Sequence, residues 1–513
     1  MRQRSDQSSQ ADNARSPFAT RHLQGNLTRR SVRGVAVTMS AQVIKVAAQF
    51  ATVAILARLL SPADFGIFAI IMALLGLLEI FKDLGLSSAT VQRAEITETQ
   101  VSTLFWLNAG LGIAAAGGLA AAAPLLGMIY GEPILTQLTP VVALTLVMTG
   151  LAAQHLALLR RQMRFTALAV LQTTAELVAM AAGILAAVMG MGLWALVVQR
   201  LTWGAAITIG AWAVCGWRPK RPAGLRAVRG LVAFGGNTTA AMVLGNVATN
   251  FYMMVIGWFW GAAPLGLYGR AQKLVQMPVQ NINVPLSAVA LPMLSRLSHD
   301  PEKYRRAYRA IVERVAMAMA PLAALLIMGA DPVVALVLGE KWVDAAPILS
   351  WMGVSAIFMP VTYTLSWLYM SQDRTGEMLR ASIVNTVLTL AAFALALPHG
   401  VAAVAAAYAV SGVFLRAPLL FHFAGRRGPV PTGDFARILT LPAVAAAAGV
   451  LAIWMLGHLP GVAALAAGGQ AVLFALATTT AALAVYGAVP AGRRAIVETW
   501  RVPRLLRSEG AGT

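Results

Sequence analysis

Runs of about 20 apolar residues recur along this chain, separated by short segments that hold most of its Lys, Arg and Pro. A helix of 20 residues is roughly 30 Å long, which matches the hydrocarbon core of a bilayer. The pattern therefore predicts membrane-spanning α-helices. They are expected at residues 33–57, 65–91, 101–124, 137–159, 166–189, 192–215, 231–257, 264–294, 308–338, 345–370, 378–397, 400–423, 437–457 and 462–489.

The two halves of the chain carry related patterns. Phe65-Gly66-Ile67-Phe68 returns as Leu265-Gly266-Leu267-Tyr268, and Pro133 and Arg160 stand 214 residues before Pro347 and Arg374. Parallel repeats of this size in an apolar sequence are typical of transporters. The expected fold is an all-α integral membrane protein with about 14 transmembrane helices, in two pseudo-symmetric six-helix lobes and a C-terminal pair. The expected parts are a disordered cytosolic tail (1–32), an N-lobe (33–215), a basic cytosolic linker (216–230), a C-lobe (231–423), the extra pair (424–489) and a basic cytosolic tail (490–513).

Composition and charge agree with a membrane protein. Hydrophobic residues make up 58% of the 513 residues, and the mean hydropathy is +0.70, so too little polar surface remains to cover a soluble domain. The net charge of +20 does not indicate nucleic acid, because the cations gather in alternate connections between apolar runs. Only Arg58 and Lys341 fall in the opposite connections. This bias predicts that both termini lie in the cytoplasm.

Polar residues at helical spacing mark the candidate substrate-binding surface. The segment 264–294 is unusually polar, and its assignment as a helix rests on the repeat. If these polar stripes from the two lobes face each other across a central cleft, that cleft is cationic and suits an anionic substrate. The alternative is that the Lys and Arg side chains reach out to the membrane interface. The stripes are Gln42, Lys45 and Gln49 on the first helix, Asn246 and Asn250 on the seventh, and Arg270, Lys273, Gln276, Gln280 and Asn283 on the eighth.

Three acidic residues are candidates for ion coupling. Glu79 and Asp83 share a face near the cytosolic end of the second helix, where an interfacial charge cluster with Lys82 is the competing interpretation. Glu176 is a lone acid in the fifth helix, and a hydrogen-bonded structural carboxylate is its competing role. The sequence holds no catalytic carboxylate pair, nucleophile or phosphate loop. The six histidines are scattered and Cys215 is the single cysteine, so we expect neither an enzyme, nor a metal site, nor a cofactor.

Several motifs carry a resemblance to a known family. They are Ala57-Arg58-Leu59-Leu60-Ser61-Pro62-Ala63-Asp64-Phe65-Gly66, Asp83-Leu84-Gly85-Leu86-Ser87-Ser88-Ala89, Ser102-Thr103-Leu104-Phe105-Trp106-Leu107-Asn108 and Leu267-Tyr268-Gly269-Arg270-Ala271. With them the chain resembles the Wzx-type polysaccharide transporters of the MOP flippase superfamily. The resemblance implies alternating-access transfer of an undecaprenyl-diphosphate-linked oligosaccharide, an exopolysaccharide or O-antigen (lipopolysaccharide) repeat unit, across the inner membrane. It also implies the bilayer, and possible polysaccharide polymerase and chain-length proteins, as partners.

Two alternatives stay open. A drug/cation antiporter of the MATE type shares the implied fold, although cationic substrates call for acidic stripes and these stripes are basic. A membrane polysaccharide polymerase or ligase belongs to a different class and is expected to need a sizeable external loop with catalytic Arg or His. The predicted external connections are all short, which argues against such an enzyme.

Overall fold

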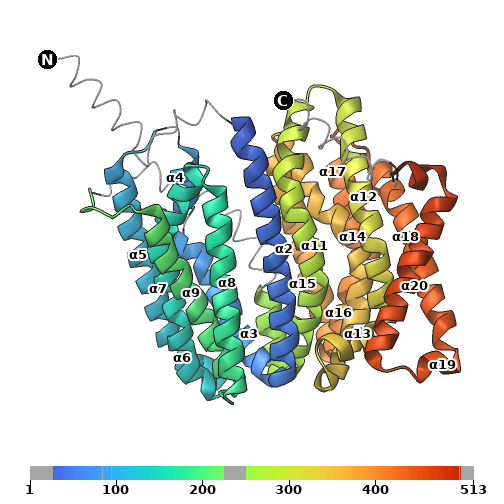
Figure 1. Ribbon diagram of the computed structural model, residues 1–513, viewed down its shortest axis with the longest axis horizontal. Helices are drawn as coiled ribbons and strands as arrows, with labels where there is room; N and C mark the ends of the chain where they lie inside the picture. The colour runs from blue at the N-terminus through green and yellow to red at the C-terminus, as the bar shows by residue number, and fades with distance from the viewer. Residues whose placement is uncertain (1–26, 84, 94, 225–249, 496, 498–513) are drawn as a thin grey trace. The chain divides into compact units, whose positions relative to one another are not determined.

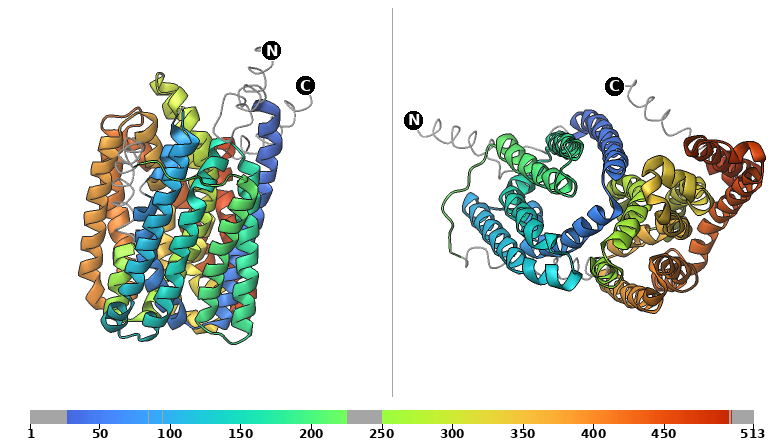
Figure 2. Two further views of the ribbon diagram at one scale, coloured as in Figure 1. Left: turned by 90° about the vertical axis from the view of Figure 1, so that its left-hand side faces the viewer. Right: turned by 90° about the horizontal axis from the view of Figure 1, so that it is seen from below.

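The computed structural model describes residues 27–83, 85–93, 95–224, 250–495 and 497, and every regular element in these residues is helical (Figure 1). The chain divides into two compact units, Met1–Ala263 and Pro264–Thr513. Within each unit the long helices stand side by side, as the end-on view in Figure 2 shows. Among the described helices, eleven are long and apolar enough to cross a membrane. The all-α membrane fold is therefore confirmed, whereas the expected number of fourteen spans is not.

The first unit contains helices α2 to α9. Their bounds are α2 (Leu27–Leu59), α3 (Pro62–Asp83), α4 (Leu86–Gln92), α5 (Glu98–Ala121), α6 (Ala123–Tyr130), α7 (Ile134–Arg161), α8 (Phe165–Val188) and α9 (Trp194–Cys215). Residues 250–260 are also helical and fall in the expected seventh helix, most of which lies outside the described residues. Helix α7 packs against α5 and α9, α9 packs against α8, and α8 packs against α2.

The second unit contains the helices from α11 onward. Their bounds are α11 (Ala262–Arg296), α12 (Pro301–Met328), α13 (Ala330–Val337), η3 (Glu340–Ala345), α14 (Ala346–Ser371), α15 (Thr375–Ala396), η4 (Leu397–His399), α16 (Val401–Ser411), the π-helical segment η5 (Gly412–Arg416), α17 (Ala417–Gly425), α18 (Thr432–Gly457), α19 (Pro460–Ala463) and α20 (Ala467–Ala488). Helix α14 packs against α12 and α16, and α16 packs against α15. The packing order α5, α7, α9, α8 of the first unit thus recurs as α12, α14, α16, α15.

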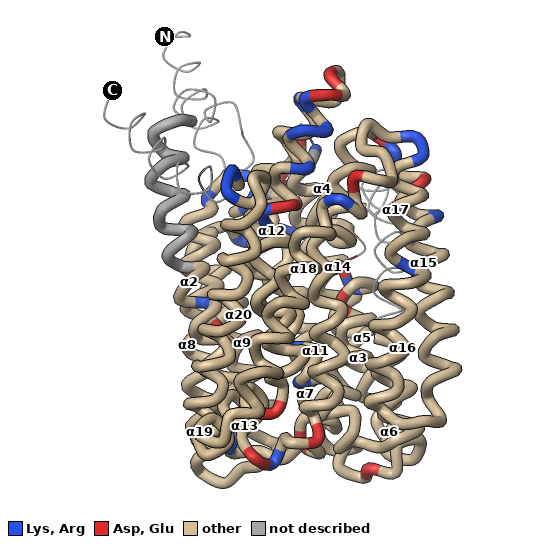
Figure 3. The backbone as a smooth tube through the Cα atoms, turned by 90° about the vertical axis from the view of Figure 1, so that its right-hand side faces the viewer, with Lys and Arg blue, Asp and Glu red and all other residues tan. Residues whose placement is uncertain are grey.

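The helices begin where the sequence supplies caps. Thr97 and Gln100 form a reciprocal capping box at α5, with the Gln100 N–H donating to Thr97 Oγ1 at 3.2 Å and the Thr97 N–H donating to Gln100 Oε1 at 3.0 Å. Asp300 caps α12 by accepting the Lys303 N–H at 3.1 Å, and this hydrogen bond holds the pKa of the Asp300 carboxyl below its usual range. In Figure 3 the Lys and Arg positions of α12 lie toward its capped end.

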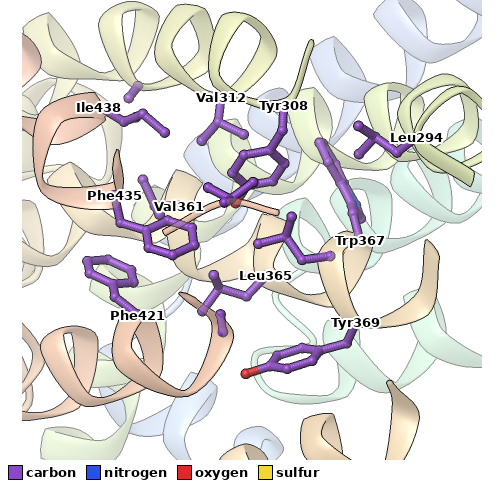
Figure 4. Close-up of a cluster of buried hydrophobic side chains, with 14 of the residues drawn as sticks. Leu294, Tyr308, Val312, Val361, Leu365, Trp367, Tyr369, Phe421, Phe435 and Ile438 are labelled. Atoms are coloured by element: carbon purple, nitrogen blue, oxygen red, sulfur yellow. The ribbon is translucent and has the colours of Figure 1, made fainter. Parts of the chain in front are cut away.

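The core of the second unit is rich in aromatic residues. Phe421 and Phe435 stack with their ring centroids 5.1 Å apart, and Tyr308 meets Phe435 edge-on at 6.2 Å (Figure 4). Asp434, only 1% exposed, accepts two hydrogen bonds from Arg305, one at 2.5 Å from Nε and one at 2.8 Å from Nη2. This bidentate pair joins α18, the first helix of the expected C-terminal pair, to α12.

Candidate functional site

A break in the expected second helix organises the polar residues of the first unit. The sequence predicts one helix over 65–91, but α3 ends at Asp83 and α4 begins at Leu86. Gly85 between them has φ 65°, a left-handed conformation that glycine adopts without the Cβ clash of other residues. The Ser87 hydroxyl donates to Asp83 Oδ1 at 2.5 Å across the break. The single-helix prediction is therefore wrong here, because glycine ends the helix inside the apolar run.

Four helices contribute to a buried polar network beside this break. Asn108 of α5 donates to the Lys82 carbonyl oxygen at 3.3 Å and accepts from Gln154 Nε2 of α7 at 2.8 Å. Thr90 of α4 then donates to Gln154 Oε1 at 2.7 Å. Asn108, Gln154 and Thr90 are all fully buried. Arg161 completes the network by donating to the carbonyl oxygens of Thr90, at 3.1 Å, and Arg93, at 2.5 Å.

The charges of α3 are engaged inside the first unit. Lys82 is only 6% exposed, and its ammonium donates to Thr149 Oγ1 of α7 at 2.5 Å. Glu79 forms a 2.7 Å ion pair with Arg200 of α9, whose guanidinium lies 4.8 Å from the centre of the Trp203 ring. The burial of Lys82 and the Glu79–Arg200 pair were not predicted from the sequence. In each case the partner, Thr149 or Arg200, lies on a helix that is distant in the chain.

The candidate ion-coupling acids have different surroundings. Glu79 is paired with Arg200, and Asp83 accepts hydrogen bonds from Ser87 and, at 3.4 Å, from Asn108. Glu176 is half-buried on α8 and has neither a hydrogen bond nor an ion pair with another described residue. Ion coupling at these acids stays a prediction.

The stripe on the first helix lies on α2, which packs against α8, the helix that carries Glu176. Gln42, Lys45 and Gln49 are all partly buried, so they belong to a face that is shielded in part by the protein. One turn further on, Thr52 is buried and donates to the Ala48 carbonyl oxygen at 2.7 Å.

The stripe on the expected eighth helix lies on α11, which is helical from Ala262 to Arg296 as the repeat predicts. Arg270, Gln276 and Asn283 are partly buried, whereas Lys273 and Gln280 are exposed. Gln280 makes a side-chain hydrogen bond with Tyr363 of α14. The helix contains Pro278, Pro285 and Pro292, each of which removes one N–H from the helical ladder.

The seventh helix contributes one described candidate. Asn246 lies outside the described residues. Asn250 is partly buried, and its side-chain amide lies beside Gly76 of α3, where an added Cβ would meet the amide at 3.6 Å. Among the described residues, no group of three His, Cys, Asp or Glu side chains is arranged to hold a metal ion.

Comparison with known protein families and relatives gives concordant matches. Residues 55–347 match the model of a family described as polysaccharide biosynthesis protein. The lipopolysaccharide biosynthesis protein WzxC of Escherichia coli (strain K12) is 24% identical over 373 residues, which cover 72% of this chain and 75% of that protein. The succinoglycan biosynthesis transport protein ExoT of Rhizobium meliloti (strain 1021) is 28% identical over 308 residues, which cover 60% of this chain and 62% of that protein.

Solved structures share the fold. The lipid II flippase MurJ in an inward closed conformation superposes with a TM-score of 0.71 at 14% identity, over 88% of this chain and 98% of that one. An inward-facing multidrug resistance MATE family transporter of the MOP superfamily superposes with a TM-score of 0.57 at 13% identity, over 78% and 99%. At these identities the likeness concerns the fold alone.

Proposed function

This chain belongs to the polysaccharide biosynthesis protein family, and on that premise we propose that it moves an undecaprenyl-diphosphate-linked oligosaccharide across the membrane by alternating access. The observation that carries the proposal is the family match over residues 55–347, more than half of the chain. The fold is that of transporters, including a lipid II flippase, whose substrate is also named as a lipid. The glycan is an exopolysaccharide or O-antigen repeat unit.

The proposal gives the cationic residues of α2 and α11 a role. A diphosphate is costly to move through a low-dielectric interior unless positive charge and hydrogen-bond donors compensate it. Lys45 on α2 and Arg270 and Lys273 on α11 supply such charge, each within its own unit. The amide side chains at the same helical spacing, such as Gln49 and Gln276, supply further donors.

The proposal includes a location and partners. The location is the bacterial inner membrane, as in the family resemblance. The cations gather in alternate connections, which supports an orientation with both termini in the cytoplasm. Glycosyltransferases on the cytoplasmic side must make the substrate, and a polysaccharide polymerase with its chain-length protein is the class that would use the flipped unit. The two six-helix lobes at 33–215 and 231–423 belong to the same proposal, and the recurring packing order supports it.

A deletion strain tests the function directly. Loss of the gene is expected to abolish a surface or secreted polysaccharide and to leave lipid-linked repeat units on the cytoplasmic face. Re-expression of the chain is expected to restore the polysaccharide and to remove the accumulated lipid-linked units. Normal polysaccharide output with new sensitivity to cationic drugs would instead favour the MATE-type antiporter, whose fold this chain shares.

A further inference from the structure

Arg416 is a buried cation in the membrane-spanning part of the second unit. It is 5% exposed and ends the π-helical segment η5, inside the apolar span Val401–Gly425. Nine residues separate it from Gly425, about 13 Å along a helix, so the guanidinium lies deep relative to a hydrocarbon core of roughly 30 Å. A charge at this depth is costly and calls for a function.

The protein groups that hold Arg416 are neutral. Its Nε donates to Ser411 Oγ at 3.2 Å, its Nη1 to Thr389 Oγ1 at 3.1 Å and its Nη2 to the Tyr408 carbonyl oxygen at 2.6 Å. The guanidinium also lies 4.1 Å from the centre of the Tyr408 ring. Within the described part of the chain, no carboxylate lies within ion-pair distance of Arg416. These contacts orient the guanidinium, and no described residue supplies a counter-ion for its charge.

The π-helical segment shapes this position. Single π-turns inside α-helices are rare and occur often at functional sites. Gly412 opens the segment, and an added Cβ there would lie 3.0 Å from Arg416 Nη2 and still closer to the Phe358 ring. The absence of a side chain at Gly412 therefore leaves room for Arg416 and for the Phe358 ring beside the backbone at this position.

A cavity of about 280 Å³ lies beside Arg416, formed by α14, α15, α16 and α17. Its lining combines aromatic rings with hydroxyl and amide groups, among them Tyr363, Tyr369, Tyr408, Ser366, Ser382 and Asn385. Apolar walls with a few polar groups and one charge are the usual composition of small-molecule sites. Tyr363 also carries the hydrogen bond to Gln280, so the cavity continues the polar stripe of α11.

Tyr369 lines the same cavity. The residue is 2% exposed, and its buried hydroxyl has no hydrogen-bond partner in the described part of the protein. The tyrosines of the same core are satisfied: Tyr304 is hydrogen-bonded to Ser371 at 2.6 Å and Tyr308 to Thr364 at 3.0 Å. Tyr369 lies apart from Tyr308 in Figure 4. An unpaired buried hydroxyl destabilises the fold, and a hydrogen-bonding group on a ligand would satisfy it.

We propose that this cavity binds one sugar unit that carries an oxyanion, as a subsite for the glycan of the transported lipid-linked oligosaccharide. Arg416 pairs with the oxyanion, the tyrosine rings cover the apolar face of the sugar, and Tyr369, Ser382 and Asn385 bond its hydroxyls. The inference rests on the proposed function. The oxyanion has two possible sources, the carboxylate of an acidic sugar or the phosphate on the first sugar.

Saturation-transfer difference NMR on the full-length protein in nanodiscs tests the subsite. The probes are glucuronate, glucose 1-phosphate and glucose. We expect signals from glucuronate, glucose 1-phosphate or both that are well above those from glucose. We expect them to weaken at least roughly tenfold in Arg416→Gln and to persist in Arg380→Gln, which alters an exposed cation of α15. Which anionic probe binds identifies the source of the oxyanion.

The opposite results would overturn the inference. Any one of three results is enough: equal signals from glucose and both anions, no signal from any probe, or anion binding by Arg416→Gln that equals that of the wild type. If Arg416→Gln does not fold, Tyr369→Phe decides. This variant removes only the unpartnered hydroxyl, so thermal stability should be kept or raised while anionic sugar binding weakens roughly two- to tenfold. Unchanged sugar binding by Tyr369→Phe would then reject the site.

The export assay separates this subsite from the proposed function. Wild-type complementation of the deletion strain together with no probe binding would remove the subsite and leave the flippase standing. Probe binding that depends on Arg416, in a protein that does not restore polysaccharide, would support the site and reject the flippase.

Discussion

Arg374 donates from Nη1 to the carbonyl oxygen of Ala424 at 3.2 Å, and in the other unit Arg164 makes the same bond to Val214 at 3.1 Å. Both arginines follow a residue with positive φ, Asp373 at 54° and Met163 at 53°. Each backbone N–H also bonds the carbonyl five residues earlier, at Tyr369 and Leu159. A separation of 210 residues thus relates two identical helix ends, each fixed to the last turn of a neighbouring helix.

This relationship predicts a structural role for Arg374. The Arg374→Gln variant loses the hydrogen bond to Ala424 and the 2.8 Å ion pair with Glu377, so we expect it to lower the free energy of unfolding by about 1–3 kcal/mol. Thermal unfolding in detergent measures the effect. Arg380→Gln is the control, because that side chain is exposed. Equal unfolding temperatures for the two variants would refute the role.

The buried amide pair of α5 and α7 should be energetically coupled. Asn108→Ala and Gln154→Ala each leave a buried partner unpaired, so each should cost about 1–3 kcal/mol of stability. The double variant should cost less than the sum, because the second change removes the group that the first left unpaired. Thermal unfolding of the four proteins gives the coupling energy. Strict additivity would contradict the pairing, and Thr174→Ala, an exposed change on α8, should be neutral.

Close approach of α5 and α7 gives a matched pair of glycine variants. A Cβ at Gly112 would lie 2.8 Å from the Leu146 carbonyl oxygen, whereas a Cβ at Gly117 would meet nothing within 4 Å. We therefore expect Gly112→Ala to destabilise the protein by about 1–3 kcal/mol. Gly117→Ala, on the same helix, should be neutral or stabilising by up to about 1 kcal/mol. Unfolding temperatures in detergent compare them, and the reverse order would be inconsistent with this packing.

Export should depend on the cations of α2 and α11. If Lys45, Arg270 and Lys273 contact the diphosphate, each loss removes charge-assisted bonds worth about 1.5–3 kcal/mol, or roughly ten- to hundredfold in affinity. We expect Lys45→Gln and Arg270→Gln each to cut polysaccharide output severely, Lys273→Gln to have a smaller effect, and Arg270→Lys to keep part of the activity.

The assay is polysaccharide output from the complemented deletion strain, with membrane abundance measured in parallel. Arg58→Gln is the control on α2, because Arg58 is exposed at the end of that helix. Full export by the Lys45→Gln, Arg270→Gln double variant would refute the proposal that these cations contact the diphosphate.

The proposed orientation predicts which connections face outward. In a Cys215→Ser background, single cysteines at Ser61, Gly131 and Gly261 should react with an impermeant thiol reagent added to cells. A cysteine at Pro222, in the basic segment after α9, should react only after the membrane is opened. Reaction at Pro222 in intact cells would reverse the orientation.

The sequence by itself determined that the chain forms α-helices and that these helices lie in a lipid bilayer. Apolar runs specify membrane-spanning helices because the bilayer leaves no other partner for backbone N–H and C=O groups. The repeat identified α11 as a helix in spite of its polar stripe. Helical periodicity grouped five polar residues on it: Arg270, Lys273, Gln276, Gln280 and Asn283. These features depend only on the spacing of residues within one segment, and this spacing can be read from the sequence.

Only the tertiary structure decided which residues meet. The sequence matched Arg160 with Arg374 at a separation of 214, whereas the folded turns match Arg164 with Arg374. It placed Lys82 at an interface, whereas Thr149 of α7 holds it in the interior. The sequence gives no partner for Arg416, whereas neutral groups of α15 and α16 hold it beside a cavity. The reason is physical: periodicity fixes the face of a helix, but the partner of that face comes from another helix, at a depth and rotation set by packing.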